Sequence, residues 1–181
     1  MKLSEMTLDE LWQLFPIVLC PHNEDWLCWY QEERDMLEAR LPSGVRIFHI
    51  GSTAVETIWA KPIVDILLET EPSMMPAADI ILVQNGYRCM HAEGGRRDYN
   101  KGYTENGFAQ KVFHLHLRAF GDHDELYFRD YLRSHPDVAK AYEALKLSLW
   151  KTYEHDRDGY TNAKSNFVTT WTQKAKKEIT I

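Results

Sequence analysis

Hydrophobic and polar positions along this chain follow two periods, and each period predicts a different kind of element. Apolar residues at helical spacing predict helices over residues 7–15, 23–41 and 76–85, and over most of the chain after residue 124. Short alternating or continuous apolar runs predict strands over residues 17–20, 45–50 and 63–68. The last run is apolar throughout except for Asp65, which is typical of a strand buried on both faces.

The middle of the chain interleaves basic and aromatic residues with glycines between Tyr87 and Phe120. This pattern predicts antiparallel strands joined by turns. The segment closes at residues 112–117, where alternation places His114 and His116 on one face of a strand. Strands followed by a helical tail predict an α+β fold, in which helices cover a mixed sheet.

Length and repeat content predict one domain. A chain of 181 residues buries about two-thirds of its unfolded surface in a core. We find no internal repeat and no linker in the sequence. We therefore expect a single domain over residues 1–181, with an α/β core in residues 1–122 and a helical part in residues 123–181.

Net charge and cysteine content limit the kinds of binding partner and the cellular compartment that we expect. The net charge of −6 disfavours nonspecific binding to nucleic acid, which depends on cationic surface. The three cysteines lack a CxxC spacing, which argues against a disulfide framework and a zinc knuckle. No window approaches the roughly 18 apolar residues of a membrane span, and the N-terminus is too acidic and polar for a signal peptide. We expect a cytoplasmic protein that has neither a membrane nor nucleic acid as its partner.

A glycine and two hydroxyl residues follow the strand predicted for residues 45–50. Gly51, Ser52 and Thr53 offer backbone N–H groups and hydroxyls that suit a phosphate, although a Gly-Ser pair after a strand is also a common turn. Asp65 favours the phosphate interpretation, because a carboxylate in an apolar strand is costly unless it is paired or bound to a ligand.

Two histidines extend this candidate site. His114 and His116 lie on the same side of a strand, about 6 to 7 Å apart at their Cα atoms. With Asp65 from a neighbouring strand they would suit a divalent metal such as Mg, Mn or Zn. In the alternative, both imidazoles hydrogen-bond within a polar sheet face. We assign Asp65 and His116 as candidate catalytic residues, and Asp65, His114 and His116 as candidate metal ligands.

Several basic residues are candidates to contact phosphate. Lys164 lies on the apolar stripe of the last predicted helix, four residues after Tyr160, so it either reaches the surface or meets an anion. Lys61, at the entrance to the buried strand, has the same two interpretations. Arg97 and Lys101 are close in sequence and suit phosphate oxygens, although such a run is often an exposed hairpin edge.

A series of motifs occurs in order from about Ile17 to Trp171. They are His49-Ile-Gly-Ser-Thr-Ala-Val55, Ala60-Lys-Pro-Ile-Val-Asp-Ile66, Gly86-Tyr87, His114-Leu-His116, Phe128-Arg-Asp-Tyr-Leu-Arg133 with His135-Pro136, and Tyr160 through Lys164 to Phe167. Together they cover nearly the whole chain, and the chain resembles the GrpB family in them. That family is similar to the nucleotidyltransferase superfamily typified by DNA polymerase beta. The resemblance implies that fold, with Gly51 and Ser52 at the phosphates of a nucleotide and Asp65 as first metal ligand.

The chain departs from the superfamily pattern at three places. The second acid of the expected Asp-x-Asp pair falls on Leu67, which cannot bind a metal. The third expected carboxylate falls around residues 114–116, where the sequence has two histidines. Glu56-Thr57 stands where the family usually has Pro-Gly. Because two-metal phosphoryl transfer relies on bridging carboxylates, the missing acid bears directly on activity.

Three functions remain open. The first is a metal-dependent enzyme that transfers a nucleotidyl or phosphoryl group to an unknown acceptor. The second is a regulatory or binding domain that holds a nucleotide or another phosphorylated small molecule without catalysis. The third is a scaffold for a protein partner, with the helical tail as the interface. We favour the first by a small margin.

Overall fold

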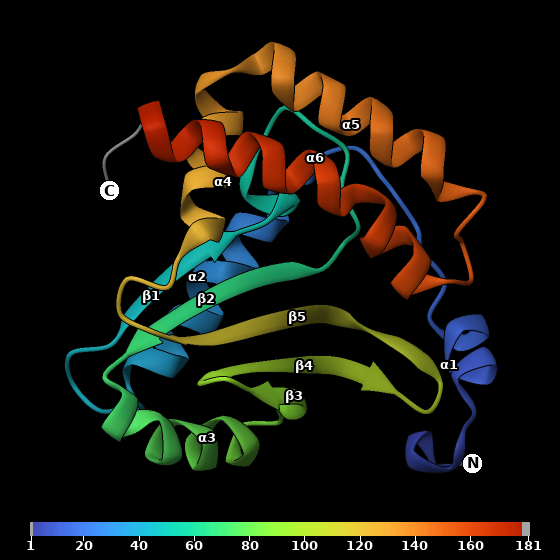
Figure 1. Cartoon of the computed structure of the whole chain (residues 1–181). Helices are drawn as coiled ribbons and strands as arrows, with labels where there is room; N and C mark the ends of the chain where they lie inside the picture. The colour runs from blue at the N-terminus through green and yellow to red at the C-terminus, as the bar shows by residue number, and fades with distance from the viewer. Residues whose placement is uncertain (1, 179–181) are drawn as a thin grey trace.

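The structure is a computed structural model that describes residues 2–178, and it is built on one five-stranded sheet (Figure 1). The strands are β1 (Arg46–Ile50), β2 (Val64–Thr70), β3 (Arg88–Glu93), β4 (Arg96–Thr104) and β5 (Gly107–Ala119). Their order is β1-β2-β5-β4-β3. β2 and β5 are parallel, and every other neighbouring pair is antiparallel. The α+β class and the antiparallel strands between residues 87 and 120 are thus confirmed.

The helices surround this sheet. They are α1 (Leu8–Leu14), α2 (Asp25–Glu38), α3 (Met75–Gln84), α4 (Asp124–Ser134), α5 (Pro136–Trp150) and α6 (Arg157–Glu178), with short 3-10 helices at Leu3–Glu5, Ser52–Ala54 and Pro72–Met74. The Thr7 hydroxyl accepts a hydrogen bond from the Glu10 backbone N–H at 3.3 Å and caps α1. In Figure 1, α4, α5 and α6 form a group on one side of the sheet. Packing of α6 against both α4 and α5 holds this group together.

The face of the sheet toward α2 and α3 carries the main hydrophobic core. Alternate residues of β2 and β5 point to this face and are fully buried, among them Ile66, Leu68, Leu115 and Leu117. They pack against apolar side chains of α2 and α3, such as Trp26. Burial of this kind stabilises the fold by about 25 cal/mol per Å² of apolar surface.

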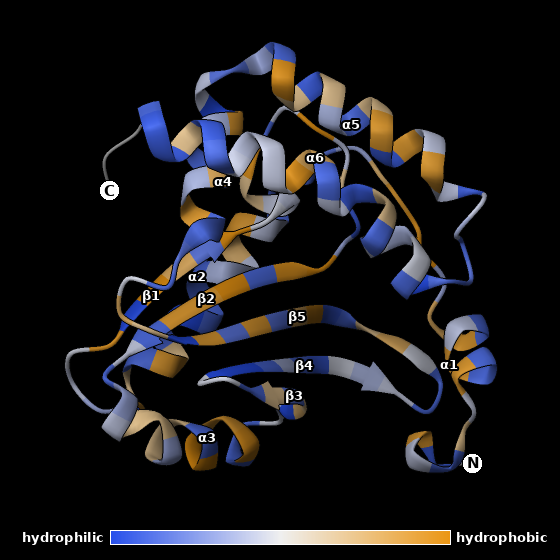
Figure 2. Cartoon of the chain, viewed as in Figure 1, coloured by the Kyte–Doolittle hydropathy of each residue, from blue (hydrophilic) through white to orange (hydrophobic). Residues whose placement is uncertain are grey.

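The opposite face of the same two strands carries polar residues. The parallel register pairs Asp65 with His114 and Leu67 with His116, so these four side chains share one face. Figure 2 shows the resulting alternation of hydrophilic and hydrophobic residues along β5. On this face Leu67 packs with Leu126 of α4. The polar residues therefore lie between the sheet and the C-terminal helices.

Two sequence predictions differ from the structure. Residues 17–20 form no strand, and only a single bridge joins Cys20 to Ala60. Pro21 follows this bridge and has no N–H to extend it. The helix predicted over residues 23–41 ends earlier, at Glu38. Within residues 2–178, no helix is both long and apolar enough to cross a membrane.

Candidate functional site

The polar residues meet where β2 and β5 run side by side. Asp65 Oδ1 lies 3.5 Å from His114 Nδ1 and 3.5 Å from His116 Nε2. The other nitrogen of each ring also has a partner. His116 Nδ1 lies 2.8 Å from Asp98 Oδ1, and His114 Nε2 lies 2.8 Å from the Tyr103 hydroxyl. The fold thus brings the candidate carboxylate and both candidate histidines into one network.

Burial and neighbouring charges shift the pKa values of this network in opposite directions. Burial alone would raise the pKa of Asp65, but hydrogen bonds from His114 and His116 hold it well below its ordinary value. Burial alone would lower the pKa of His116, but Asp65 and Asp98 raise it to about 9. Burial lowers the pKa of His114, against the effect of Asp65. At neutral pH the network therefore holds a protonated His116 between two carboxylates.

Gly51 forms the turn between β1 and the 3-10 helix at Ser52–Ala54. Its backbone has φ 72° and ψ −172°, a region essentially restricted to glycine. A Cβ atom at this position would lie 2.5 Å from Asp65 Oδ2. His49 supports the turn from the other side, because its Nε2 lies 2.9 Å from Thr53 Oγ1. The turn is thereby held against the Asp65 carboxylate.

Cationic side chains line one half of a cleft at this turn. They are Lys61, Lys146, Arg157 and Lys164, and we call this part the cationic half. Its cavity has a volume of about 330 Å³ and also reaches Thr53, His114 and the exposed Asp158. Within residues 2–178, none of the four cations forms an ion pair with a carboxylate.

The cations of this half make contacts other than ion pairs. Lys146, which is only 2% exposed, donates hydrogen bonds to Ser52 Oγ at 3.0 Å and to a backbone carbonyl. Lys61 and Lys164 place Nζ 5.5 and 4.3 Å from the centre of the Tyr160 ring. Arg157 Nη1 is buried and has no hydrogen-bond partner among the described residues. A buried donor of this kind is costly until an acceptor meets it, so this half is suited to an anion.

The pKa values of the three lysines lead to the same conclusion. Burial, together with the charges of Arg157 and Lys164, lowers the pKa of Lys61 well below its ordinary value. Burial and the charge of Lys164 lower the pKa of Lys146 to about 7. Burial, opposed by Asp65 and aided by Arg157, lowers the pKa of Lys164 to about 8. A bound anion would oppose both burial and repulsion, and would keep these lysines charged.

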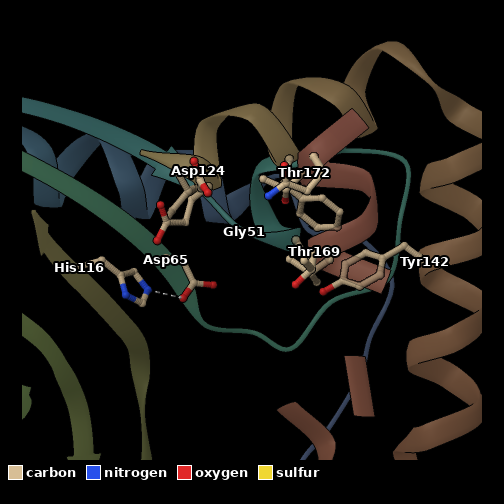
Figure 3. A pocket seen from close by; sticks show the side chains of 13 residues that line it. Gly51, Asp65, His116, Asp124, Tyr142, Thr169 and Thr172 are labelled. Carbon is tan, nitrogen blue, oxygen red and sulfur yellow. Dashed lines mark ion pairs between the residues drawn. The ribbon is translucent and has the colours of Figure 1, made fainter. Parts of the chain in front are cut away.

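The other half of the cleft is acidic. Gly51, Ser52, Asp65 and Tyr142 line both halves. Asp124, Glu125, Phe128, Thr169, Thr172 and Gln173 line only the second, which we call the acidic half and which has a volume of about 360 Å³. Figure 3 shows the Asp65 carboxylate and the His116 ring directed toward each other, with Tyr142 and Thr169 across the pocket. Asp65 therefore stands where two chemically different halves meet.

Two of the predicted phosphate ligands lie elsewhere. Arg97 and Lys101 face α2 and α3, because the register of β4 on β5 gives the His116 side of the sheet to Asp98. Arg97 Nη1 lies 3.4 Å from Asp79 Oδ2, and Lys101 Nζ lies 2.6 Å from Glu33 Oε1. Both cations are already paired on the far face of the sheet. The structure therefore does not bring them to the cleft at Gly51 and Ser52.

Other residues of the cleft escaped the sequence analysis. Lys146 lies four residues after Tyr142 on an apolar stripe, which is the same signal that selected Lys164. Applied consistently, that signal would have found it. Arg157 begins α6 and has no periodicity to mark it. Asp98 meets His116 only through the strand register.

The residues near Asp65 do not form the paired-carboxylate metal site of the superfamily. Within residues 2–178, no group of three or more His, Cys, Asp or Glu side chains is arranged to hold a metal ion. Leu67, at the position of the second acid, is fully buried in apolar contacts. Asp65 and Asp98 raise the pKa of His116 to about 9, so a metal ion on this ring would have to displace a proton. A divalent metal on Asp65, His114 and His116 stays a prediction.

Solved structures with the same fold define the class of this protein. A crystal structure of the conserved protein GrpB from Enterococcus faecalis matches with a TM-score of 0.77 and 27% identity, over 89% of this chain and 98% of that one. The Cid1 poly(U) polymerase matches with a TM-score of 0.52 and 10% identity, over 70% of this chain and 42% of that one. The chain thus has a nucleotidyltransferase-like fold.

Sequence relatives identify the family. Residues 16–174 match the GrpB protein family. Glutamate-rich protein GrpB of Alkalihalophilus pseudofirmus is 34% identical over 84% of this chain and 91% of that protein. The UPF0157 protein YqkA of Bacillus subtilis is 31% identical over 97% of this chain, which spans about half (53%) of the length of YqkA. This chain belongs to the GrpB family.

Proposed function

We propose that this protein binds a nucleotide, or another phosphorylated small molecule, with its phosphates in the cationic half of the cleft. The observation that carries this proposal is the group of four cations without a carboxylate partner within residues 2–178. Ser52 adds a hydroxyl already held by Lys146 at 3.0 Å. Phosphate oxygens would pair with these cations and with the buried Arg157 Nη1.

The nucleotidyltransferase-like fold supports a nucleotide as the ligand. Cid1, which shares this fold over 70% of the chain, was crystallised with MgGTP. Gly51 and Ser52 occupy the turn after the first strand, where the family resemblance implies phosphate binding. The likeness carries no information on the base, because it rests on the fold alone.

Transfer of a nucleotidyl or phosphoryl group to an acceptor is a second candidate. The position of Asp65 favours it, because this carboxylate lines both halves of the cleft. Phosphates in the cationic half and an acceptor in the acidic half would meet beside it. Asp65 would orient the acceptor, and the positive charge of His116 would offset the charge that develops on the transferred group.

A thermal melting series tests the proposal. Nucleoside triphosphates, with Mg²⁺ or Mn²⁺ and with a chelator, should raise the melting temperature, since a ligand at 100 times its Kd stabilises by about 2.7 kcal/mol. If the cations bind the phosphates, the melting temperature should rise even in the presence of chelator, and the Lys164→Gln substitution should reduce this rise. A shift that requires metal and disappears in Asp65→Asn would favour metal-dependent transfer. The absence of any shift would contradict nucleotide binding and leave the scaffold function.

A further inference from the structure

We propose that the acidic half of the cleft binds a second small ligand through a protonated amine. If the proposed function holds, this second ligand would be the acceptor, because the two ligands would meet at Asp65. It rests on Glu125, on the charges around it and on the other residues of the same cavity.

Glu125 is the carboxylate in this cavity that has no cationic partner. Its Oε2 atom is buried and has no hydrogen-bond partner in the part of the chain that the structure describes. Within residues 2–178, Glu125 also forms no ion pair. Burying a carboxylate oxygen without a donor is costly, and a ligand that brings a donor would remove this cost.

The other carboxylates of the acidic half are already compensated. Asp124 Oδ1 lies 2.7 Å from Lys176 Nζ. Asp65 is paired with His116, whose ring is held between Asp65 and Asp98. Counted by ion pairs within residues 2–178, one negative charge remains in the cavity, at Glu125. The charge of Arg96 also acts on it, and the first turn of α4 favours a carboxylate, but neither donates a hydrogen bond to Oε2. A protonated amine carries one positive charge and three N–H donors, so it matches both the charge and the missing donor.

The rest of the wall indicates a small polar molecule around that amine. Phe128 and Tyr142 form an aromatic corner, with ring centres 5.2 Å apart. Thr169, Thr172 and Gln173 on α6 bring hydroxyl and amide groups to the same cavity. A volume of about 360 Å³ is at the small end of ligand sites. An amine-bearing ring with hydroxyl groups fits these walls.

Glucosamine and glucose are a matched pair of probes, because they differ in one amine at nearly equal shape. Calorimetry should detect binding of glucosamine to the wild-type protein near neutral pH, and glucose at the same concentration should bind at least tenfold more weakly. Glu125→Gln should weaken glucosamine binding at least tenfold, whereas Glu105→Gln, an exposed carboxylate in the β4–β5 turn, should leave it unchanged. Absence of glucosamine binding, or equal binding of glucose, overturns the proposal.

Two further measurements test whether Glu125 has only a structural role and whether the amine site is distinct from the phosphate site. The melting temperature of Glu125→Gln without ligand should equal or exceed that of the wild type, since the change removes an unpaired buried charge; a marked decrease would indicate a structural role instead. Lys164→Gln should weaken triphosphate binding but not glucosamine binding, and Glu125→Gln should do the reverse. Failure of triphosphate binding alone would overturn the proposed function and leave the amine site standing.

Discussion

Lysines on the apolar stripe of a helix are the most informative single residues of this chain. Lys146 and Lys164 both sit where a leucine would pack, and both reach the cationic half of the cleft. Neither has a carboxylate partner within residues 2–178. Burying such charges costs stability, and an anionic ligand is the compensation that the cleft offers.

Replacing Lys164 by glutamine should weaken triphosphate binding about tenfold, since a hydrogen bond to a charged group contributes about 1.5–3 kcal/mol. Lys177→Gln, an exposed position on the same helix, provides a matched control. Isothermal titration of both variants with ATP checks the expectation. If the two variants bind ATP with equal affinity, Lys164 does not contact the phosphates.

Anion binding should weaken as the pH rises, because Lys146 and Lys164 have lowered pKa values of about 7 and about 8. Only their protonated forms attract an anion. Sulfate keeps a constant charge from about pH 6 to pH 9, so its affinity should fall at least about tenfold over this range. Titrating sulfate against the melting temperature at several pH values measures this. A constant or rising affinity would mean that these lysines do not hold the anion.

Asp98→Asn should lower the pKa of His116 from about 9 toward its ordinary value of 6.5, since Asp98 supplies a hydrogen bond and a charge to this ring. The raised pKa means that the His116 contacts stabilise the fold fully below about pH 6.5 and lose this contribution as the pH rises through about 9. Titration of the imidazole by NMR checks both values. A pKa in the variant that stays near 9 would show that Asp65 alone holds the proton.

At the residue scale, the sequence predicted chemistry better than location. Asp65 stood out because a carboxylate interrupted an apolar strand, and it does lie in the cleft. Arg97 and Lys101 are equally basic, yet they face the other side of the sheet. Which face a strand residue takes depends on register, and the bulge between Lys101 and Tyr103 shifts that register.

At the element scale, the turn after β1 holds the site together. Gly51 has a backbone conformation essentially restricted to glycine, and a Cβ atom there would lie 2.5 Å from Asp65 Oδ2. The turn therefore positions Ser52 relative to β2, and the phosphate site depends on this geometry.

Gly51→Ala should destabilise the protein by about 1–3 kcal/mol through backbone strain, and should also weaken triphosphate binding as the new Cβ displaces Asp65. Gly44→Ala is the control, because Gly44 also has a positive φ, of 92°, but a Cβ there would have no neighbour within 4 Å. Urea unfolding and ATP titration of both variants separate the effects. If the two variants lose the same stability and both bind ATP normally, the close approach to Asp65 has no role.

Most strands of the sheet were predictable from the sequence, but which strands pair with each other was not. Alternation along the sequence is enough to place His114 and His116 on one face of β5. Nothing in the local pattern says that β5 pairs in parallel with β2, because that contact joins residues 49 positions apart, such as Val64 and Phe113, through a long connection. The sequence analysis grouped Asp65 with these histidines as a hypothesis that their strands are neighbours, and the register of β2 on β5 bears this out.

At the scale of the whole molecule, the cleft lies between the sheet and the C-terminal helices. Val55 and Ile58, from the connection between β1 and β2, pack in one cluster with Tyr131, Val138 and Ala175 of the helical part. The two parts therefore share a hydrophobic cluster. Ligand binding would therefore involve both parts at once, since Ser52 comes from one and Lys146 from the other.

The central claim is that the cationic half binds the phosphates of a nucleotide. Isothermal titration of the wild-type protein with AMP, ADP, ATP and inorganic tripolyphosphate, in chelator at one ionic strength, tests it most directly. The four cations, which have no carboxylate partner within residues 2–178, predict that affinity rises from AMP to ADP to ATP, and that tripolyphosphate competes with ATP. Equal affinities for the three nucleotides, or no binding by any of them, would contradict the claim.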